Sequence, residues 1–530
     1  MRRGLLIAGI AGYLALLLAN ACYFAYGPDP SGYLNEARML AAGRTSLPIA
    51  PVLQLGLDPA LGSIFTPFGF AARPDGTMVP TYPVGTPVHL ALAAAVGGWT
   101  IAPYLVSPFA AIGCLVLMAA VGRQFGLSKG WSIVAAVLLA AVPVFISHAL
   151  QPVSDVLAVF WALLAIWAAN RASGPPRGFA VLAGVAFAIG VAVRPTNLLM
   201  ALPLLLAMWG GLQPAMWGGL QPAMWGGLQP ARPRGLKPAP HRLKPAPHRV
   251  WIAAVSSLPV ALALMWYSNA LYGSPFATGY GTAGDVLQWS VFGKCGSFHV
   301  RTLSLLMIPA IAPLGLLVAF VRRIALMQRV LLVSWGLVFF AFYSMYDICD
   351  SVESSRFMLP AVPPLIIGFL HVLQWRTGNP ACPHHEGTGR IAGTGRIACL
   401  PLFAAVCVLL VLAVQVRNVG SLHVLHANES ESVYPETVRW SQGIIPKNAV
   451  VATGLLSGAY FHDTGRVTIR WDQVQPDSAA ILRNAFPKDA PWYALLSQVE
   501  GDADDLARHM PGQWEAVGSN RDITLWRLRP

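Results

Sequence analysis

The chain has 530 residues, of which 55% are hydrophobic and only 11% are charged. Soluble globular proteins carry about 25% charged residues, so this composition excludes an ordinary soluble enzyme and predicts a membrane protein. The net charge of +13 does not indicate nucleic-acid binding, because the basic residues lie between hydrophobic runs and no nucleic-acid motif accompanies them.

Apolar runs of the length that crosses a bilayer, about 20 residues, recur along the chain. The sequence therefore predicts a mainly α-helical, polytopic protein of about eleven transmembrane helices, with residues 1–416 as the transmembrane domain. The predicted spans are 5–26, 101–122, 131–148, 154–170, 178–194, 196–210, 250–271, 302–321, 330–345, 357–375 and 399–416.

Charge placement predicts the orientation of these spans. Eleven spans with the N-terminus in the cytoplasm place 18 of the 25 Lys and Arg residues before residue 417 in cytoplasmic segments. We expect a bacterial cytoplasmic (inner) membrane with the C-terminal domain in the periplasm. The first span leaves one alternative open: Ala19-Asn20-Ala21 before Cys22 also fits the end of a cleaved signal peptide.

The first outer loop, residues 27–100, is the longest of the membrane part. It opens with Asp29 between two prolines, and Ser31 is expected to cap a helix that runs along the membrane surface to about Ala42. Asp29 could also be only a turn residue. Farther on, Thr81-Tyr82-Pro83-Val84-Gly85-Thr86-Pro87 leads into the apolar stretch 88–98, which is expected to be interfacial or re-entrant.

Three further charged residues lie at predicted outer ends of spans. Asp155 opens the fourth span, close to Ser147-His148, and could be a helix N-cap. Arg194 and Arg356 lie where an arginine fork could grip a phosphate, although snorkelling to lipid headgroups would also explain them. Other polar residues expected on this side are Tyr280, Asp285, Tyr346, Asp347, Asp350 and Glu353.

Two predicted cytoplasmic loops carry short tandem repeats. MWGGLQPA occurs three times from Met208 within the loop 208–249, and GTGRIA occurs twice from Gly387. Such perfect copies, rich in Pro and Gly, are typical of expansions in a tolerant loop. A basic lipid-binding role for 232–249 remains the alternative.

The seven cysteines form no CxxC pair, so no zinc site or disulfide framework is predicted. Cys295 and Cys349 both fall in outer loops and could pair there. Cys382 with His384 and His385 lacks a fourth spaced ligand and is expected to be a plain loop segment.

From Arg417 the composition becomes that of a soluble domain, and residues 417–530 are predicted to form a small α/β domain. Strands are expected at 450–453, 467–471, 492–496 and 523–528, and helices at 434–443, 477–486 and 502–509. The domain has no Gly-rich phosphate loop; acceptor contact, capping of the site and structural support are its expected roles.

Four of these features together resemble the C-type membrane glycosyltransferases (GT-C superfamily), which include protein O-mannosyltransferases and the aminoarabinose transferase of lipid A. The first outer loop opens with an acidic residue and a helix, here Asp29 onward. A Tyr-Pro-x-Gly-x-Pro stretch follows at Tyr82–Pro87, Ser154-Asp155 opens a later span, and Arg356 to Pro360 form an Arg-aromatic-x-Leu-Pro signature.

The resemblance implies a glycosyltransferase that moves a sugar from a polyprenyl-phosphate donor to a lipid, glycan or protein acceptor on the outer face of the membrane. It implies Asp29 as general base, Asp155 as supporting carboxylate, and Arg194, Arg356 and Tyr82 as donor-binding residues. Many members have two adjacent acidic residues where this chain has Asp29-Pro30, so the use of a divalent metal stays open. No nucleic-acid partner is expected.

Two other functions fit a polytopic protein of this kind. One is a transporter or flippase of a lipid-linked sugar, although the spans lack charged residues in their middle and show no inverted repeat. The other is a non-catalytic assembly factor of the cell envelope. Replacement of Asp29 separates the three, because only sugar transfer needs a base there.

Overall fold

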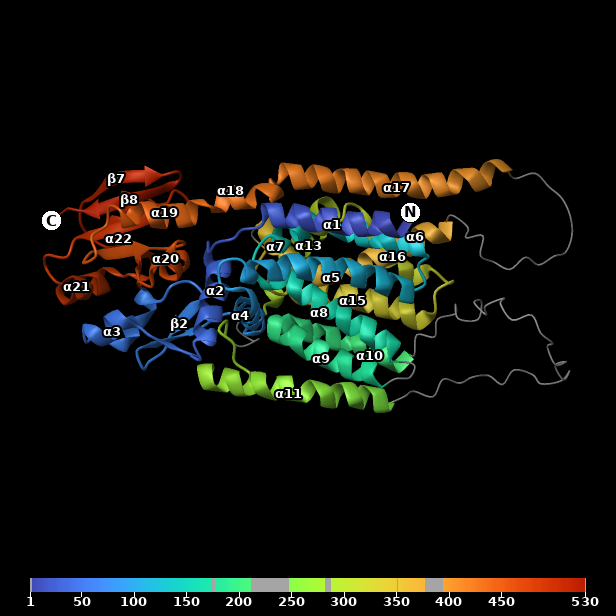
Figure 1. Ribbon diagram of the computed structural model, residues 1–530, viewed down its shortest axis with the longest axis horizontal. Coiled ribbons are helices and arrows are strands. Elements are labelled where there is room, and N and C mark those ends of the chain that lie inside the picture. The colour runs from blue at the N-terminus through green and yellow to red at the C-terminus, as the bar shows by residue number, and fades with distance from the viewer. Residues whose placement is uncertain are drawn as a thin grey trace, which may run out of the picture.

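The computed structural model describes residues 2–172, 177–210, 247–281, 287–349, 351–376 and 394–529. Most of the repeat loop, Asp285, Asp350 and Cys382 with its two histidines lie outside these ranges. The described chain is mainly helical: long helices run side by side in a bundle, and a mixed β-sheet region lies at one end of it (Figure 1).

Among the described residues, six helices are long and apolar enough to cross a membrane, and up to eight spans result if each of two bent pairs is one span. The protein is therefore a multi-pass membrane protein. The long helices of the bundle are α1 (Arg2–Asn20), α5 (Ala102–Gln124), α8 (Ser154–Arg171), α9 (Gly178–Val193), α10 (Ala201–Gly210), α11 (Pro247–Tyr272), α15 (Leu326–Ser344), α16 (Val362–Arg376) and α17 (Thr394–Ser421).

Two of the predicted spans are not continuous helices, which corrects the prediction. The span expected at 131–148 bends by 69° between α6 (Lys129–Ala140) and α7 (Pro143–Ala149). The span expected at 302–321 bends by 105° between the segment Trp289–Met307, which holds α13 (Phe292–Arg301) and η4 (Thr302–Met307), and the segment Ile311–Phe320, which begins with α14 (Ile311–Leu316). A proline lies at each break, and proline lacks the N–H that a continuing helix needs.

The first long loop, residues 27–100, folds on the side of the bundle that faces the β-sheet region. It contains α2 (Pro28–Ala41), α3 (Ala50–Gln54), η1 (Pro59–Phe65) and α4 (Gly85–Gly97), and a three-stranded antiparallel sheet of order β1-β3-β2. Its strands are β1 (Leu47–Pro48), β2 (Phe70–Ala72) and β3 (Thr77–Pro80).

Helix α2 differs from its prediction in two respects. It begins at Pro28, not after Ser31, and the Ser31 hydroxyl donates back to the Gly27 carbonyl. It is also not an exposed helix, because nearly every residue from Pro30 to Met39 is buried. The helix is enclosed between the bundle and the C-terminal region.

The C-terminal region is a five-stranded mixed sheet of order β5-β4-β6-β8-β7, in which β4 pairs in parallel with β5 and β6, and β8 pairs antiparallel with β6 and β7. The strands are β4 (Val450–Thr453), β5 (Ile469–Arg470), β6 (Trp492–Ser497), β7 (Trp514–Asn520) and β8 (Ile523–Leu528). The helices are α19 (Val433–Gln442), α20 (Ser457–Thr464), α21 (Pro476–Ala485) and α22 (Ala503–His509). All seven predicted elements are present, whereas β7, α20 and the short helix α18 (Ala427–Glu431) were not predicted.

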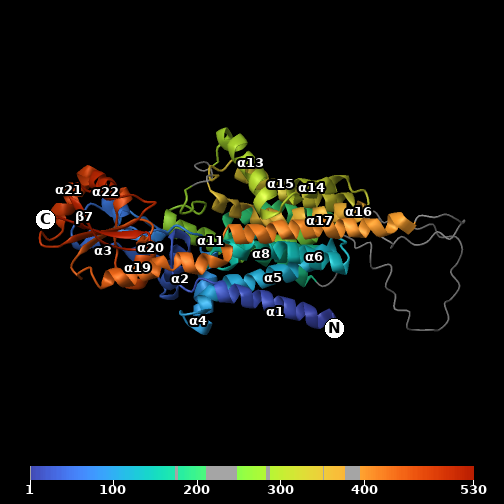
Figure 2. The same ribbon diagram turned by 90° about the horizontal axis from the view of Figure 1, so that it is seen from above.

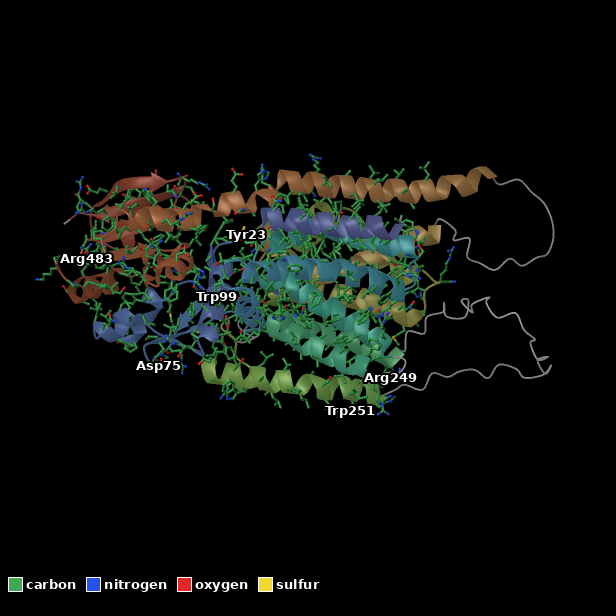
Figure 3. The ribbon with its side chains drawn as sticks, in the orientation of Figure 1. Tyr23, Asp75, Trp99, Arg249, Trp251 and Arg483 are labelled. Carbon is green, nitrogen blue, oxygen red and sulfur yellow. A yellow bond between two sulfur atoms is a disulfide. The ribbon has the colours of Figure 1, made fainter. Side chains whose placement is uncertain are left out.

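The first loop and the C-terminal region share one hydrophobic core. Ile49, Phe65 and Met78 of the loop belong to the same buried cluster as Val450 and Leu496 of the sheet. In Figures 1 and 2 the two segments lie together at one end of the molecule. In Figure 3, the labelled side chain of Asp75 lies at this end of the molecule, and that of Arg249 lies at the opposite end.

Polar contacts join α2 directly to α20. Asn35 donates to the Gly458 carbonyl at 3.0 Å, Arg38 donates to the His462 carbonyl at 2.8 Å, and the Asn35 amide oxygen lies 3.0 Å from His462 Nδ1. The C-terminal region therefore holds the helix on which Asp29 lies.

This junction predicts a loss of stability in acid. Burial, and then the charge of Arg38, lower the pKa of His462 to about 3. A histidine with a depressed pKa favours folding while neutral, so its contribution is full above about pH 6.5 and falls as the pH decreases toward the folded pKa, by roughly 2 kcal/mol at pH 5. We expect the thermal midpoint to fall between pH 7 and pH 5, and to fall less in His462→Asn. An equal fall in both would contradict the role of His462.

Candidate active site

Two carboxylates and two arginines, far apart in sequence, meet where the bundle faces the first loop. Asp29 lies in the first turn of α2, Asp155 in the first turn of α8, Arg194 directly after α9, and Arg356 in η6 (Val352–Ala361). The Arg356 guanidinium pairs with Asp29 at 2.6 Å, and Arg194 pairs with Asp155. The structure thus brings together all four charged residues that the sequence nominated.

The two ion pairs differ in access. The side chains of Asp29 and Arg356 are 26% and 18% exposed, whereas those of Asp155 and Arg194 are only 2% and 10% exposed. Solvent therefore reaches the first pair, whereas the second pair is buried. The alternatives raised for three of these residues do not describe them: Asp155 makes no N-cap hydrogen bond, and Arg194 and Arg356 both pair with carboxylates of the protein.

Both guanidinium groups lie close to one aromatic ring, that of Phe357. The Arg194 and Arg356 guanidinium carbons lie 4.9 Å and 5.3 Å from the centre of the Phe357 ring. Cation–π attraction of this kind fixes arginine side chains without consuming their N–H donors. The Tyr343 ring stacks on the Phe357 ring, with the two ring centres 5.3 Å apart. The Tyr343 hydroxyl donates a hydrogen bond to the Thr196 hydroxyl at 2.7 Å.

Tyr82 holds Asp29 from the other side. Its hydroxyl donates to Asp29 Oδ1 at 2.8 Å, while Arg356 occupies Oδ2. Burial, and then the nearby Asp29 carboxylate, raise the pKa of Tyr82, which therefore remains a protonated donor. Its ring lies 4.6 Å from that of Tyr33 and 6.2 Å from that of Tyr280.

Two glycines, Gly32 and Gly85, allow close packing around Tyr82 and next to Arg194. A Cβ on Gly32 would lie 2.2 Å from the Tyr82 ring, and one on Gly85 would lie 2.4 Å from the backbone at Ala192 and Val193. Gly32 thus lets Tyr82 reach the turn that carries Asp29. Gly85 lets the start of α4 touch the end of α9, next to Arg194. These two contacts give a physical reason for the glycines of the Pro-Ser-Gly-Tyr and Tyr-Pro-x-Gly segments.

A cavity of about 160 Å³ adjoins the site on the side of α9 and α11. Its walls are largely apolar and aromatic, with Tyr82, Pro195, Tyr267, Tyr272 and Phe276 among them. Tyr267 also donates to Glu36, a fully buried carboxyl of α2, at 3.2 Å. Burial raises the pKa of Glu36 well above its usual value.

The residues around Asp29 do not fit a divalent cation. Both oxygens of Asp29 already accept hydrogen bonds from donors, and one of these donors is a guanidinium group. Divalent cations such as Mg²⁺ and Ca²⁺ prefer several oxygen ligands. Among the described residues, the one group of three potential ligands is Cys295, Asp347 and Cys349, and its two cysteines are joined to each other.

That disulfide settles a pairing the sequence left open. Cys295 and Cys349 form an S–S bond, with their Cα atoms 5.3 Å apart. The bond links α13 to the segment between α15 and η6. Helix α15 contains Tyr343, and η6 contains Arg356. Lys294 and Asp347 pair beside it at 3.3 Å.

The aromatic residues of the site were the main omission of the sequence analysis. Phe357 was part of the Arg-aromatic signature but received no role, and neither Tyr343 nor Tyr33 was nominated. Tyr33 donates to Ser154 at 3.0 Å and so joins α2 to α8. Aromatic residues are common in apolar spans, so only the fold distinguishes those that contact the charged cluster.

Known proteins match this chain in their three-dimensional structures but not in their sequences. No protein-family model and no curated protein sequence matches the chain. The fold is similar to ArnT from Cupriavidus metallidurans bound to undecaprenyl phosphate, with a TM-score of 0.55 and 13% identity over 99% of this chain and 98% of that one.

A second similar structure is the archaeal oligosaccharyltransferase AglB from Archaeoglobus fulgidus in complex with an inhibitory peptide and a dolichol-phosphate. It has a TM-score of 0.51 and 10% identity over 95% of this chain and 71% of that one. Over nearly its whole length, the chain therefore has the fold of the GT-C glycosyltransferases.

Proposed function

We propose that this protein is a glycosyltransferase that transfers a sugar from a polyprenyl-phosphate donor to an acceptor hydroxyl at the outer face of the membrane. The observation that carries this proposal is the cluster of Asp29, Arg356, Asp155 and Arg194 within a GT-C fold. ArnT and AglB were both solved with a polyprenyl-type phosphate, which supports the same class of donor here.

The pairing of Arg356 with Asp29 suggests how donor binding prepares the base. The four residues of the cluster carry two negative and two positive charges, and the exposed carboxylate of Glu353 lies 3.8 Å from Arg356 as a third negative charge. A donor phosphate competes with Asp29 for Arg356, which grips phosphate well through its planar fork. When Arg356 turns to the phosphate, Asp29 loses its cation and becomes free to accept a proton.

Chemistry then proceeds at the anomeric carbon of the sugar. The acceptor oxygen attacks this carbon while Asp29 takes the proton of the acceptor hydroxyl. The bond between the anomeric carbon and the phosphate oxygen breaks, and the electron pair leaves with the polyprenyl phosphate. Arg356 stabilises the negative charge that develops on this leaving group.

The supporting roles follow from access. Asp155 and Arg194 are buried behind the exposed pair, and they fix the Phe357 ring and the start of η6 on which Arg356 lies. Tyr82 orients the Asp29 carboxylate. The apolar cavity beside Tyr82 and Pro195 suits the isoprenoid segment next to the donor phosphate.

The fuller topology belongs to the same proposal. Adding α1, α9 and the η2–α10 segment (η2, Pro195–Met200) to the six long helices and the two bent pairs gives the eleven predicted spans. The N-terminus is then cytoplasmic. A disulfide at Cys295 supports an oxidising, extracytoplasmic environment for the end that carries the site. A periplasm-dependent reporter fused after Pro530 should be active, and an inactive one would reject this orientation.

The proposal predicts that Arg356 controls donor affinity. In Arg356→Gln we expect the KM for an undecaprenyl-phosphate-linked sugar to rise and kcat/KM to fall about a hundredfold, in line with the loss of a bidentate charged contact. Arg356→Lys should fall in between, because lysine keeps the charge but loses the planar fork. The measurement is initial-rate sugar transfer in proteoliposomes.

Arg73→Gln is the matched control, since Arg73 lies in the same outer region and is 37% exposed. It should transfer sugar at the wild-type rate. If Arg356→Gln kept a wild-type kcat/KM, the phosphate role of Arg356 would be rejected.

A further inference from the structure

Three polar atoms, one of them in Arg356 of the charged cluster, are buried but have no hydrogen-bond partner within the described parts of the chain. They are Nε2 of His148, Oγ of Ser355 and Nε of Arg356. His148 and Ser355 are 2% and 0% exposed, so bulk water does not reach them. Burying a polar group without a partner is costly, and native structures usually satisfy such groups with a protein atom or an ordered water.

These atoms lie on two segments that pack together. His148 is in α7, Ser355 and Arg356 are neighbours in η6, and α7 packs against η6. The charges of Asp155 and Arg356 both act on the His148 ring. The three atoms therefore lie on two segments in contact, and one of these segments carries Arg356.

Their donor and acceptor capacities are complementary. His148 Nδ1 lies 2.8 Å from the Val144 carbonyl, which can only accept, so Nδ1 carries the proton of the neutral ring and Nε2 is an acceptor. Arg356 Nε is a donor, and the Ser355 hydroxyl can be either. One water molecule can donate to Nε2 while it accepts from the guanidinium group, and buried waters typically make about three such bonds.

We propose that His148, Ser355 and Arg356 share a buried water site, and that through it His148 acts as a positioning residue for the Arg356 guanidinium. The water ties the inner edge of Arg356 to α7, while the outer edge remains free to pair with Asp29 or with a phosphate. The water site itself is independent of the proposed function; the effect on phosphate binding rests on it.

The first test is direct observation. A cryo-electron microscopy map of the full chain in lipid nanodiscs, at a resolution that shows other buried waters, should contain a density peak within hydrogen-bond distance of all three atoms. A map without that peak, or with another side chain bonded to His148 Nε2, would overturn the proposal.

The second test asks whether His148 acts on Arg356. Undecaprenyl phosphate is the probe, and its dissociation constant is measured for protein in nanodiscs. His148→Phe keeps a planar ring without the acceptor, and we expect binding to weaken about tenfold, as for loss of one hydrogen bond to a charged network. His148→Gln, whose amide oxygen can accept the same bond, should stay within about threefold of the wild type.

His371 provides a matched control. It is also a buried histidine with an unpartnered Nε2, but it lies in α16 near Phe125 and Gly126, outside the cluster. His371→Phe should bind undecaprenyl phosphate as the wild type does. Equal losses in the two Phe variants, or wild-type binding in His148→Phe, would reject a positioning role.

The outcomes separate this inference from the proposed function. If the wild type bound undecaprenyl phosphate but transferred no sugar, and the variants still followed the expected order, the glycosyltransferase proposal would fail and the positioning role would stand. If the wild type transferred sugar and His148→Phe bound and transferred equally well, the reverse would hold.

Discussion

Replacing Asp29 by asparagine is expected to lower the kcat for sugar transfer at least about a hundredfold, the usual contribution of a general base. The amide has the same shape and its oxygen can still accept the Tyr82 hydrogen bond, but it cannot take a proton from the acceptor hydroxyl. The measurement is initial-rate transfer from an undecaprenyl-phosphate-linked sugar in proteoliposomes, with donor binding recorded separately.

Asp58→Asn is the control for this experiment. Asp58 is an exposed residue of the same loop and accepts a hydrogen bond from the Ala60 N–H as the cap of η1, a role that asparagine fills equally well. Its transfer rate should match the wild type. Normal transfer by Asp29→Asn would reject Asp29 as the base, and unchanged movement of a lipid-linked sugar with no transfer in either protein would favour a flippase.

Replacing Arg194 by methionine is expected to destabilise the protein by about 3–5 kcal/mol, the cost of breaking a buried ion pair from one side. The change would leave Asp155, whose side chain is only 2% exposed, without its ion partner inside the bundle. The measurement is the difference in free energy of unfolding, obtained from reversible denaturation of the protein in mixed micelles.

The double variant Arg194→Met/Asp155→Leu distinguishes stability from binding. Because it removes both charges, most of the lost stability should return. If Arg194 also contacts the donor phosphate, transfer should remain low although the fold has recovered. A cost below about 1 kcal/mol for the single variant, the range typical of exposed pairs, would contradict the buried placement of this pair.

The four charged residues of the site could be nominated from the sequence because charges are expensive beside membrane spans. Asp29, Asp155, Arg194 and Arg356 stood out against an apolar background, and the resemblance to the GT-C superfamily singled them out from the other charged residues expected on the same side. Their pairing could not be predicted, since the sequence offered two arginines for two carboxylates and nothing that ranked the combinations. The structure pairs Arg356 with Asp29, its most distant candidate in sequence, and Arg194 with Asp155.

Errors in the predicted elements have a common cause. Hydropathy detects apolar segments but not their direction, so the bends at Pro143 and Pro309 were included in continuous spans at 131–148 and 302–321. Likewise, the pattern of α2 suggested a surface helix because its few apolar residues could not reveal a second covering layer. That layer is α20, whose contacts with Asn35 and Arg38 cross more than 400 residues.

By itself, the sequence determined that the chain is a multi-pass, helical membrane protein with a mixed α/β segment at its end, since hydrophobicity and strand or helix patterns are local properties. Only the tertiary structure decided that Asp29 meets Arg356, that both arginines lie near the Phe357 ring, and that the C-terminal region covers the first loop. These contacts depend on how helices pack against one another, and packing is set by the shapes of whole surfaces that no short segment of sequence contains.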